Sequence, residues 1–135
     1  MIGVEISNRC LETGERVIER DGLTNARVVY STAETALAHL FEPNTLAQVH
    51  VNFPDPWFKV RHTHRRIMRR EVMDWIVSRM IPGATFHLAT DIQDYAETSA
   101  ELLADTPHLE KLLSSPWARE MPGRVITKYE ATAIR

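Results

Sequence analysis

Cysteine is nearly absent from this sequence, and it has neither a strong excess of one charge nor a long apolar run. The single Cys10 cannot form an internal disulfide, which fits a reducing compartment such as the cytoplasm. The formal net charge is −2, with 16 Lys and Arg residues against 18 Asp and Glu residues, so no overall positive field attracts nucleic acid. No run of about 18 apolar residues occurs, so we expect no membrane-spanning helix. The first residues show neither a basic leader nor an apolar core, so we expect no secretory signal.

The composition that is present is typical of an ordinary globular protein. Of the 135 residues, 44% are apolar and 25% are charged, which argues against disorder. A chain of this length has room for a single hydrophobic core. We therefore expect residues 1–135 to form one domain.

Apolar periodicity predicts strands that alternate with helices along the chain. Val49 and Val51 alternate with polar residues at a period of two in the clearest strand. Alternating strands and helices are typical of a mostly parallel sheet with helices on its faces. The predicted fold class is therefore α/β, with strands at residues 2–6, 26–30, 47–53, 85–89 and 124–134, and helices at 9–20, 33–41, 68–80 and 92–104.

Cap and turn residues predict where the helices begin and end. Ser7 and Asn8 suit the start of the first helix, and Asp91 is available as the N-cap of the helix at 92–104. Pro82-Gly83 should end the helix at 68–80, because proline cannot continue a helix and glycine favours its end.

Three acidic residues follow predicted strands. Glu5 lies near the end of the first strand, Asp55 follows the third and Asp91 follows the fourth. Open parallel sheets bind ligands just outside the carboxyl ends of their strands. Any one of these acids alone is more often a helix cap or a solvated loop residue. Three of them on one rim favour a functional site there.

The basic residues are concentrated in one short stretch. Six of the 16 fall within twelve positions that contain no acid, whereas the remaining sequence holds ten basic and eighteen acidic residues. A cluster of this kind can hold phosphates, but it is as often a solvated face. The six residues of this basic band are Lys59, Arg61, Arg65, Arg66, Arg69 and Arg70.

The segment from residue 52 to 62 is the most informative part of the chain. Pro54 and Pro56 restrict the backbone on either side of Asp55, so its carboxylate is held at a low entropic cost. Trp57 offers a flat apolar face that could stack on a base, and Lys59 and the arginines beyond it could hold phosphates. Together these residues suggest an enzyme that acts on a nucleic-acid base. The alternative is a proline-rich turn with a buried tryptophan.

At this point the sequence resembles a known family, the S-adenosylmethionine-dependent tRNA (guanine-N7)-methyltransferases. The Asn-Phe-Pro-Asp-Pro-Trp run with its basic tail is highly specific, whereas Gly-Val-Glu alone would be weak. The matching segments occur in family order over nearly the whole chain, at residues 3–6, 52–57, 59, 61–62, 65–66, 86–91 and 127–130.

The resemblance implies a fold, a reaction and a cofactor. The fold would be a truncated Rossmann-like class I methyltransferase domain, with helices on both faces of a mostly parallel sheet and its first strand absent. The reaction would be methyl transfer from S-adenosylmethionine to N7 of guanosine-46 in the variable loop of tRNA. The resemblance also implies a cytoplasmic protein, with a monomer favoured, and neither a membrane nor a metal is expected as a partner.

Roles for individual residues follow from the same resemblance. Glu5 matches the acid that binds the ribose hydroxyls of the cofactor, and Thr32 stands where the family has an acid near the adenine. Asp55 matches the proposed catalytic acid, which lies beside both the cofactor and the guanine. The positions that contact the substrate are Lys59, Asp91, Thr127, Lys128, Tyr129 and Glu130, and those that hold the RNA backbone are Arg61, His62, Arg65 and Arg66.

The sequence departs from the family pattern in its glycines. None of the five glycines forms a Gly-x-Gly turn, the loop that lets the backbone approach the methionine part of the cofactor. The absent first strand would lie between the strand of Glu5 and that of Val49, so its loss leaves two strand edges unpaired or rearranged. We therefore expect a partial domain, 1–135, that binds S-adenosylmethionine weakly or not at all by itself.

Two other functions remain open. One is a methyltransferase for exocyclic amines of DNA or RNA, whose Asn/Asp-Pro-Pro-aromatic motif superficially resembles residues 52–57. The other is a non-catalytic RNA-binding remnant or partner subunit that keeps the basic band. His62 and His64 lack a third ligand at a recognisable spacing, so we expect no metal site. Cys10 is expected to be buried or half-buried in its helix.

Overall fold

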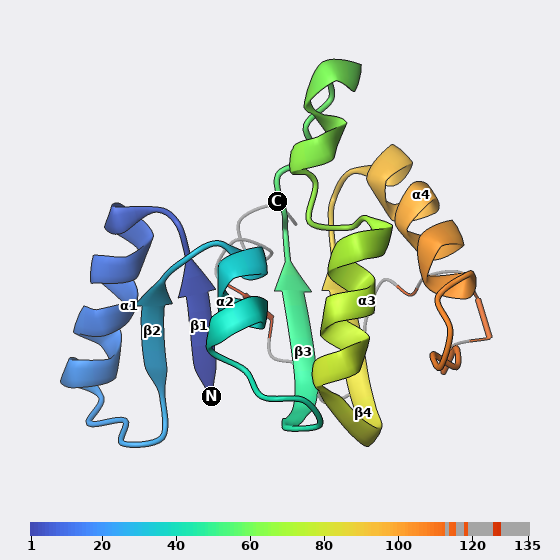
Figure 1. Cartoon of the computed structure of the whole chain (residues 1–135). Helices are drawn as coiled ribbons and strands as arrows, with labels where there is room; N and C mark the ends of the chain where they lie inside the picture. The colour runs from blue at the N-terminus through green and yellow to red at the C-terminus, as the bar shows by residue number, and fades with distance from the viewer. Residues whose placement is uncertain (113, 116–117, 119–125, 128–135) are drawn as a thin grey trace.

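The computed structural model describes residues 1–112, 114, 115, 118, 126 and 127. The strand expected at 124–134 therefore falls outside the described residues, apart from 126 and 127. Strands and helices alternate in the order predicted from the periodicity (Figure 1). The elements are β1 (Ile2–Glu5), α1 (Asn8–Arg20), β2 (Arg27–Tyr30), α2 (Ala33–His39), β3 (Leu46–Asn52), the 3-10 helix η1 (Val60–Arg65), α3 (Arg70–Arg79), β4 (Met80–Ala89) and α4 (Gln93–Ala104).

Local hydrogen bonds explain where the helices begin. Ser7 is the N-cap of α1, and its hydroxyl accepts from the backbone N–H of Cys10 at 3.4 Å, as the sequence predicted. Cys10 itself is exposed, so the expected burial was wrong. The prediction that Asp91 caps α4 was also wrong. The N-cap is Ile92, whose N–H donates to the hydroxyl of Thr90 at 3.2 Å.

Pro82-Gly83 does not separate a helix from a loop. Helix α3 already ends at Arg79, and β4 starts at Met80 and continues through these two residues. The pairing with β3 is irregular here, since Leu46 pairs with Met80 but Gln48 pairs with Thr85. Gly83 has a φ of +80°, a conformation that glycine adopts without steric cost. The extra residues are therefore accommodated as an irregularity at the start of the strand.

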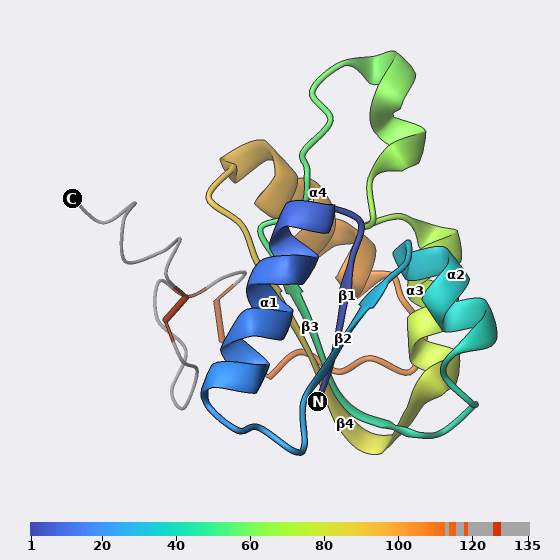
Figure 2. The same ribbon diagram turned by 90° about the vertical axis from the view of Figure 1, so that its left-hand side faces the viewer.

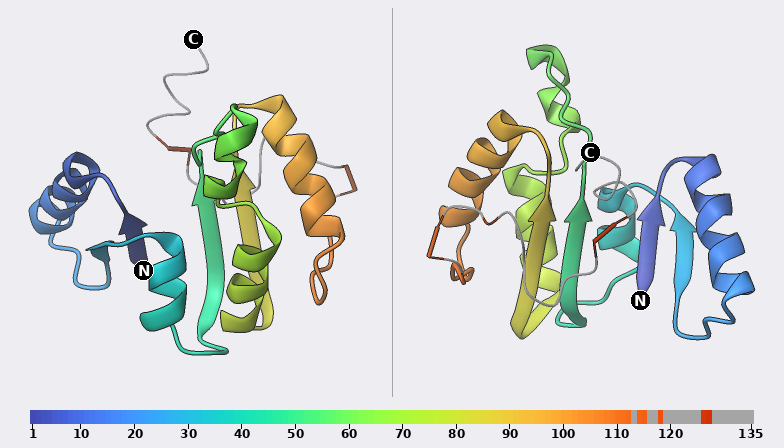
Figure 3. Two further views of the ribbon diagram at one scale, coloured as in Figure 1. Left: turned by 45° about the horizontal axis from the view of Figure 1, so that its top comes forward. Right: turned by 180° about the vertical axis from the view of Figure 1, so that it is seen from behind.

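The four strands form two separate parallel pairs. β1 pairs with β2 and β3 pairs with β4, each in parallel register. Figures 1 and 3 show all four strands running in the same direction, in the spatial order β2, β1, β3, β4. Parallel pairing in an α/β chain is thus confirmed. The four strands do not join into one sheet, because β1 and β3 share no ladder of hydrogen bonds among the described residues. This agrees with the expectation that the edges of these two strands are left unpaired or rearranged.

The buried core lies on one side of this division. It is formed by side chains from α2, from α3 and the residues before it, from the start of β4 and from α4, and none of its members precedes Leu37 in the described chain. Val51 of β3 is buried, whereas His50 beside it is exposed, as the period of two predicted. Figure 2 shows α1 and α2 on opposite sides of β1 and β2. The core residues are Leu37, Met68, Val72, Met73, Ile76, Met80 and Tyr95.

None of the helices in the described part of the chain is long and apolar enough to cross a membrane.

Candidate active site

An open cleft of about 550 Å³ lies at the carboxyl ends of β3 and β4. This volume is within the range of small-molecule and base-binding sites. The cleft is lined by residues 52–56, Phe58, Asp91, Ile92 and Thr127. It therefore brings together Asp55 and Asp91, two of the three rim acids predicted from the sequence, with Thr127 from far along the chain.

The loop that carries Asp55 has an unusual backbone. The N–H of Phe53 donates to the carbonyl oxygen of Ala89 at 2.8 Å and extends the β3–β4 ladder by one bond. Phe53 and Trp57 then adopt left-handed conformations, with φ values of 49° and 43°. Such values are rare for bulky residues and store strain, which is concentrated at functional sites in proteins. Asp55 thus projects, exposed, from a turn that two strained aromatic residues bracket.

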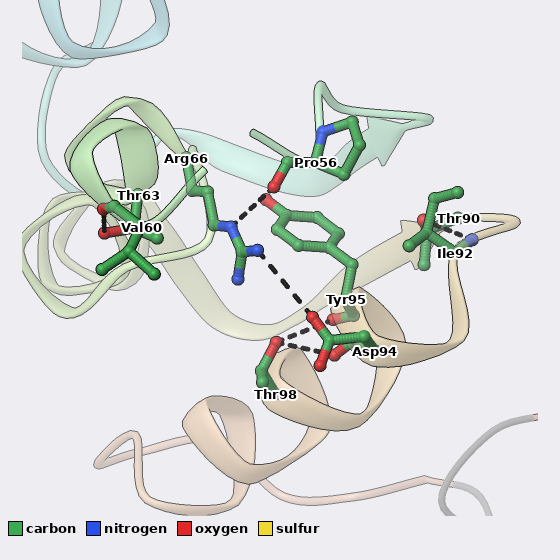
Figure 4. Close-up of polar contacts among 9 residues, drawn as sticks. All are labelled: Pro56, Val60, Thr63, Arg66, Thr90, Ile92, Asp94, Tyr95 and Thr98. Atoms are coloured by element: carbon green, nitrogen blue, oxygen red, sulfur yellow. Dashed lines mark hydrogen bonds and ion pairs between the residues drawn. The ribbon is translucent and has the colours of Figure 1, made fainter. Parts of the chain in front are cut away.

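Arg66 connects this loop to α4 (Figure 4). Its Nε donates to the carbonyl oxygen of Pro56 at 2.7 Å, and its Nη2 lies 3.8 Å from Oδ2 of Asp94. The guanidinium carbon lies 5.1 Å from the centroid of the Tyr95 ring, a cation–π distance. Only 16% of the Arg66 side chain is exposed. Arg66 is therefore bound inside the protein, although the resemblance implied that it holds the RNA backbone.

The ring of Tyr95 packs against the Arg66 guanidinium. The residue is 1% exposed, and its hydroxyl accepts from the N–H of Met68 at 3.2 Å. Burial raises the pKa of the Tyr95 hydroxyl, while the hydrogen bond from Met68 and the charge of Arg66 partly oppose that rise. The phenol therefore stays neutral at physiological pH and acts as an acceptor that links α4 to the segment before α3.

The basic band divides into an inward and an outward group. Arg69 forms an ion pair with Glu34, and Arg70 forms one with Asp74 at 3.1 Å, so both have partners within the protein, although Arg70 is itself exposed. The outward group lies on an arm, residues 57–65, which includes η1 and stands apart from the sheets at the carboxyl ends of the strands (Figures 1 and 2). Its exposed cations are Lys59, Arg61 and Arg65.

Trp57 forms the base of this arm. The guanidinium of Arg65 lies 5.1 Å from the centroid of the indole ring, and the His62 ring meets it edge-on at 5.8 Å. Arg61 donates from its Nε to the ring nitrogen Nε2 of His62 at 3.2 Å. Trp57 is half-buried, and it is not among the residues that line the cleft.

Glu5 is at the same end of the molecule but outside the lining of the cleft. It is the last residue of β1, which runs parallel to the other strands. Its Oε1 accepts from the N–H groups of Ile6 and Ser7, each at 2.8 Å. Because both bonds go to one oxygen, the carboxylate is held in a fixed orientation at the turn into α1.

Thr32 and its neighbour Glu34 stabilise the start of α2. The hydroxyl of Thr32 accepts from the N–H of Thr35 at 3.1 Å and caps the helix. Burial alone would raise the pKa of Glu34, but its own backbone N–H and the adjacent Arg69 lower that pKa below its usual value. Both side chains therefore have structural partners at this site.

The described residues do not cover every predicted contact. Thr127 lines the cleft, whereas Lys128, Tyr129 and Glu130 lie outside the described residues. Within the part that is described, no group of three or more His, Cys, Asp or Glu side chains is placed to hold a metal ion. One residue of the site, Phe58, was not singled out from the sequence. Arg66 was singled out for the RNA backbone, but its internal contacts could not be recognised within a run of similar cations.

Comparison with known proteins identifies the family. A family model described as a putative methyltransferase matches residues 1–135. The chain belongs to this methyltransferase family. A tRNA (guanine-N(7)-)-methyltransferase from Burkholderia vietnamiensis is 37% identical over 134 residues, which is 99% of this chain and 52% of that protein. The resemblance noted on the sequence motifs is thereby confirmed.

Other relatives carry the same name. A tRNA (guanine-N(7)-)-methyltransferase from Nitrosospira multiformis is 42% identical over 118 residues, which is 87% of this chain and 51% of that protein. One from Paraburkholderia xenovorans is 35% identical over 134 residues. The chain spans about half the length of these curated relatives.

Proposed function

We propose that this methyltransferase chain binds tRNA and presents a guanine for S-adenosylmethionine-dependent methylation at N7. The observation that carries the proposal is the cleft in which Asp55 and Asp91 lie together, next to an arm with three exposed cations. Carboxylates suit the donor groups of a guanine, and exposed arginine and lysine side chains suit phosphates. The names of the relatives support the same substrate. The proposal includes a cytoplasmic protein that acts as a monomer on guanosine-46.

Methyl transfer to N7 of guanine requires little acid or base catalysis. N7 of guanine already has a lone pair, so no proton has to be removed before it attacks a methyl group. Catalysis then depends on alignment and on the placement of charge. We assign Asp55 to accept from N1–H and the exocyclic amine of the guanine, which orients N7. The strained turn that brackets Asp55 supports this role, because it limits the movement of the carboxylate.

The residues present fit one end of the cofactor. S-adenosylmethionine, when bound, supplies a methyl group activated on a sulfonium. Glu5 fits its ribose, since Oε1 is held by two backbone N–H groups and Oε2 is left to accept a hydroxyl. Thr32 fits less well, because its hydroxyl caps α2. No Gly-x-Gly turn occurs in the 135 residues, so we expect calorimetry on this chain alone to detect weak binding or none, and micromolar binding would contradict this.

A finer description of the fold belongs to the same proposal. We infer a single partial domain over residues 1–135, a truncated Rossmann-like sheet in which one further parallel strand fits between β1 and β3. Two-stranded parallel sheets are rarely stable alone, and within the described part of the chain the facing edges of β1 and β3 are not paired with one another. Hydrogen exchange tests this. Amides of β1 and β3 that point away from β2 and β4 should exchange fast, and protection equal to that of the paired amides would contradict it.

The catalytic proposal is tested by changing Asp55 in an active relative at the matching position. Both Asp55→Asn and Asp55→Ala should reduce methyl transfer by about 100-fold or more, in line with the loss of a positioning charge from an active site. Unchanged turnover would remove Asp55 from catalysis. Analysis of the methylated product distinguishes N7 from an exocyclic amine, so it also tests the alternative methyltransferase class.

A second candidate function is RNA binding without catalysis. The outward group Lys59, Arg61 and Arg65 favours it, since these side chains are exposed whatever the chemistry of the cleft. Salt-dependent tRNA binding with no methyl transfer, even by a protein that includes a Gly-x-Gly segment, would select this function. Methyl transfer by that protein would exclude it.

A further inference from the structure

Phe58 is an exposed aromatic residue in the wall of the cleft. Its side chain is among the most exposed large apolar ones in the described chain, at 72%, and the residue lines the cleft together with Asp55 and Asp91. An exposed aromatic ring lacks the favourable free energy that burial of its apolar surface would supply. The arrangement is suited to a flat ligand that has polar edges and an apolar face.

The backbone on both sides of Phe58 is anchored. Arg66 holds the carbonyl oxygen of Pro56, and the indole of Trp57 packs against Arg65 and His62. After Phe58, the chain enters η1, for which Lys59 is the N-cap. Phe58 therefore lies between two fixed segments while its own side chain stays exposed, as Figure 4 shows for the Arg66 contact. Because the backbone is anchored, little backbone entropy is lost when the ring covers a ligand.

We propose that Phe58 stacks on the face of the guanine whose edge Asp55 and Asp91 contact. This inference rests on the proposed function. Trp57, the ring expected from the sequence to stack on a base, is instead the internal support of the arm. Every base has an apolar face, so Phe58 provides affinity, and the carboxylates select guanine from the other bases through its N1–H and amine donors.

The test uses RNA binding by the full chain. The probe is an RNA hairpin with one unpaired guanosine in its loop, and its matched partner has an abasic site at the same position. The variants are Phe58→Ala and Phe58→Tyr. Val60→Ala is the control, because Val60 is 85% exposed on the same arm and does not line the cleft.

Phe58→Ala should weaken binding of the guanosine hairpin by about 5- to 100-fold, the usual range for the loss of one base–aromatic stack. It should leave the abasic hairpin unaffected, and Phe58→Tyr should restore binding. A fluorescent guanine analogue at the loop position should be quenched by the wild-type chain and not by Phe58→Ala. Circular dichroism checks that each variant is folded.

The possible failures are distinguishable. If the wild-type chain binds both hairpins equally, or if Phe58→Ala weakens both equally, stacking by Phe58 is wrong while RNA binding by the arm stands. If the wild-type chain binds neither hairpin, the proposed function and the stacking are both wrong. An effect of Val60→Ala as large as that of Phe58→Ala would also overturn the assignment.

Discussion

Arg66 donates from Nε to the carbonyl oxygen of Pro56 at 2.7 Å, and this bond fixes the residue that follows Asp55. The same guanidinium lies over Tyr95 and near Asp94, both on α4. One side chain therefore ties the strained loop after β3 to the helix after β4. This arginine therefore holds together the loop and the helix that flank the cleft.

Replacement of Arg66 by lysine should lower the stability of the protein and loosen the cleft. Lysine keeps the charge but cannot reproduce the planar contact with Pro56 and Tyr95. We expect the free energy of unfolding to fall by about 1–3 kcal/mol in urea denaturation, the usual cost of losing a half-buried charged hydrogen bond. Arg65→Lys is the control, because Arg65 is exposed. An equal loss for both variants would contradict a special role of Arg66.

Charge reversal on the arm should weaken RNA binding in a salt-dependent way. Lys59→Glu with Arg65→Glu should reduce affinity for tRNA at least about 10-fold and flatten the slope of log K against log salt by about one unit for each phosphate that is no longer bound. Arg16→Glu, on the exposed face of α1, changes the net charge by the same amount per substitution and should leave the slope unchanged. Unaltered binding by the double variant would exclude the arm from the RNA interface.

Removal of the Tyr95 hydroxyl should destabilise the protein at neutral pH. In Tyr95→Phe the N–H of Met68 loses its acceptor at a buried position, so we expect a loss of about 1–2 kcal/mol. Tyr30→Phe is the control, since Tyr30 is 62% exposed.

Tyr95→Phe should also change how the stability of the protein depends on pH in the alkaline range. Because the pKa of Tyr95 is raised in the folded protein, the folded state keeps a proton that the unfolded state releases above about pH 10. The wild-type protein should therefore lose stability as the pH rises through that region, and Tyr95→Phe should lose less. Thermal unfolding between about pH 9 and pH 11 measures the difference. Parallel curves for the two proteins would contradict the prediction.

Acid should weaken the link between α2 and α3. The pKa of Glu34 is lowered in the folded protein, so its ion pair with Arg69 contributes stability above the ordinary pKa of 4.5 and loses it as the pH falls through the folded value. Since both side chains are partly exposed, we expect Glu34→Gln to cost less than about 1 kcal/mol at pH 7. The cost should shrink as the pH falls below 4.5, and a cost that does not change with pH would contradict the prediction.

The sequence alone determined the order of the elements and where the functional loop would be. The period of two around Val49 and Val51, and the cap at Ser7, are local signals, and the strand and helix they predict are present. The Pro-Asp-Pro turn is also local, because prolines restrict the backbone whatever surrounds them. The family motifs stand in the same short segment, so they too can be recognised from the order of the residues.

Only the tertiary structure decided what individual side chains contact. Arg65 and Arg66 are adjacent in the sequence and chemically identical, yet one is exposed beside Trp57 and the other is bound to Pro56. No periodic pattern in the sequence distinguishes the two arginines, because the contacts of Arg66 depend on α4, a helix about thirty residues further along the chain. The same reason applies to Phe58 and Trp57, whose places in the cleft and in the arm depend on what packs against the loop. Pairing between strands is likewise a long-range property, so local pattern predicts the strands but not their partners. Only the comparison with the family pattern led us to expect unpaired edges between β1 and β3.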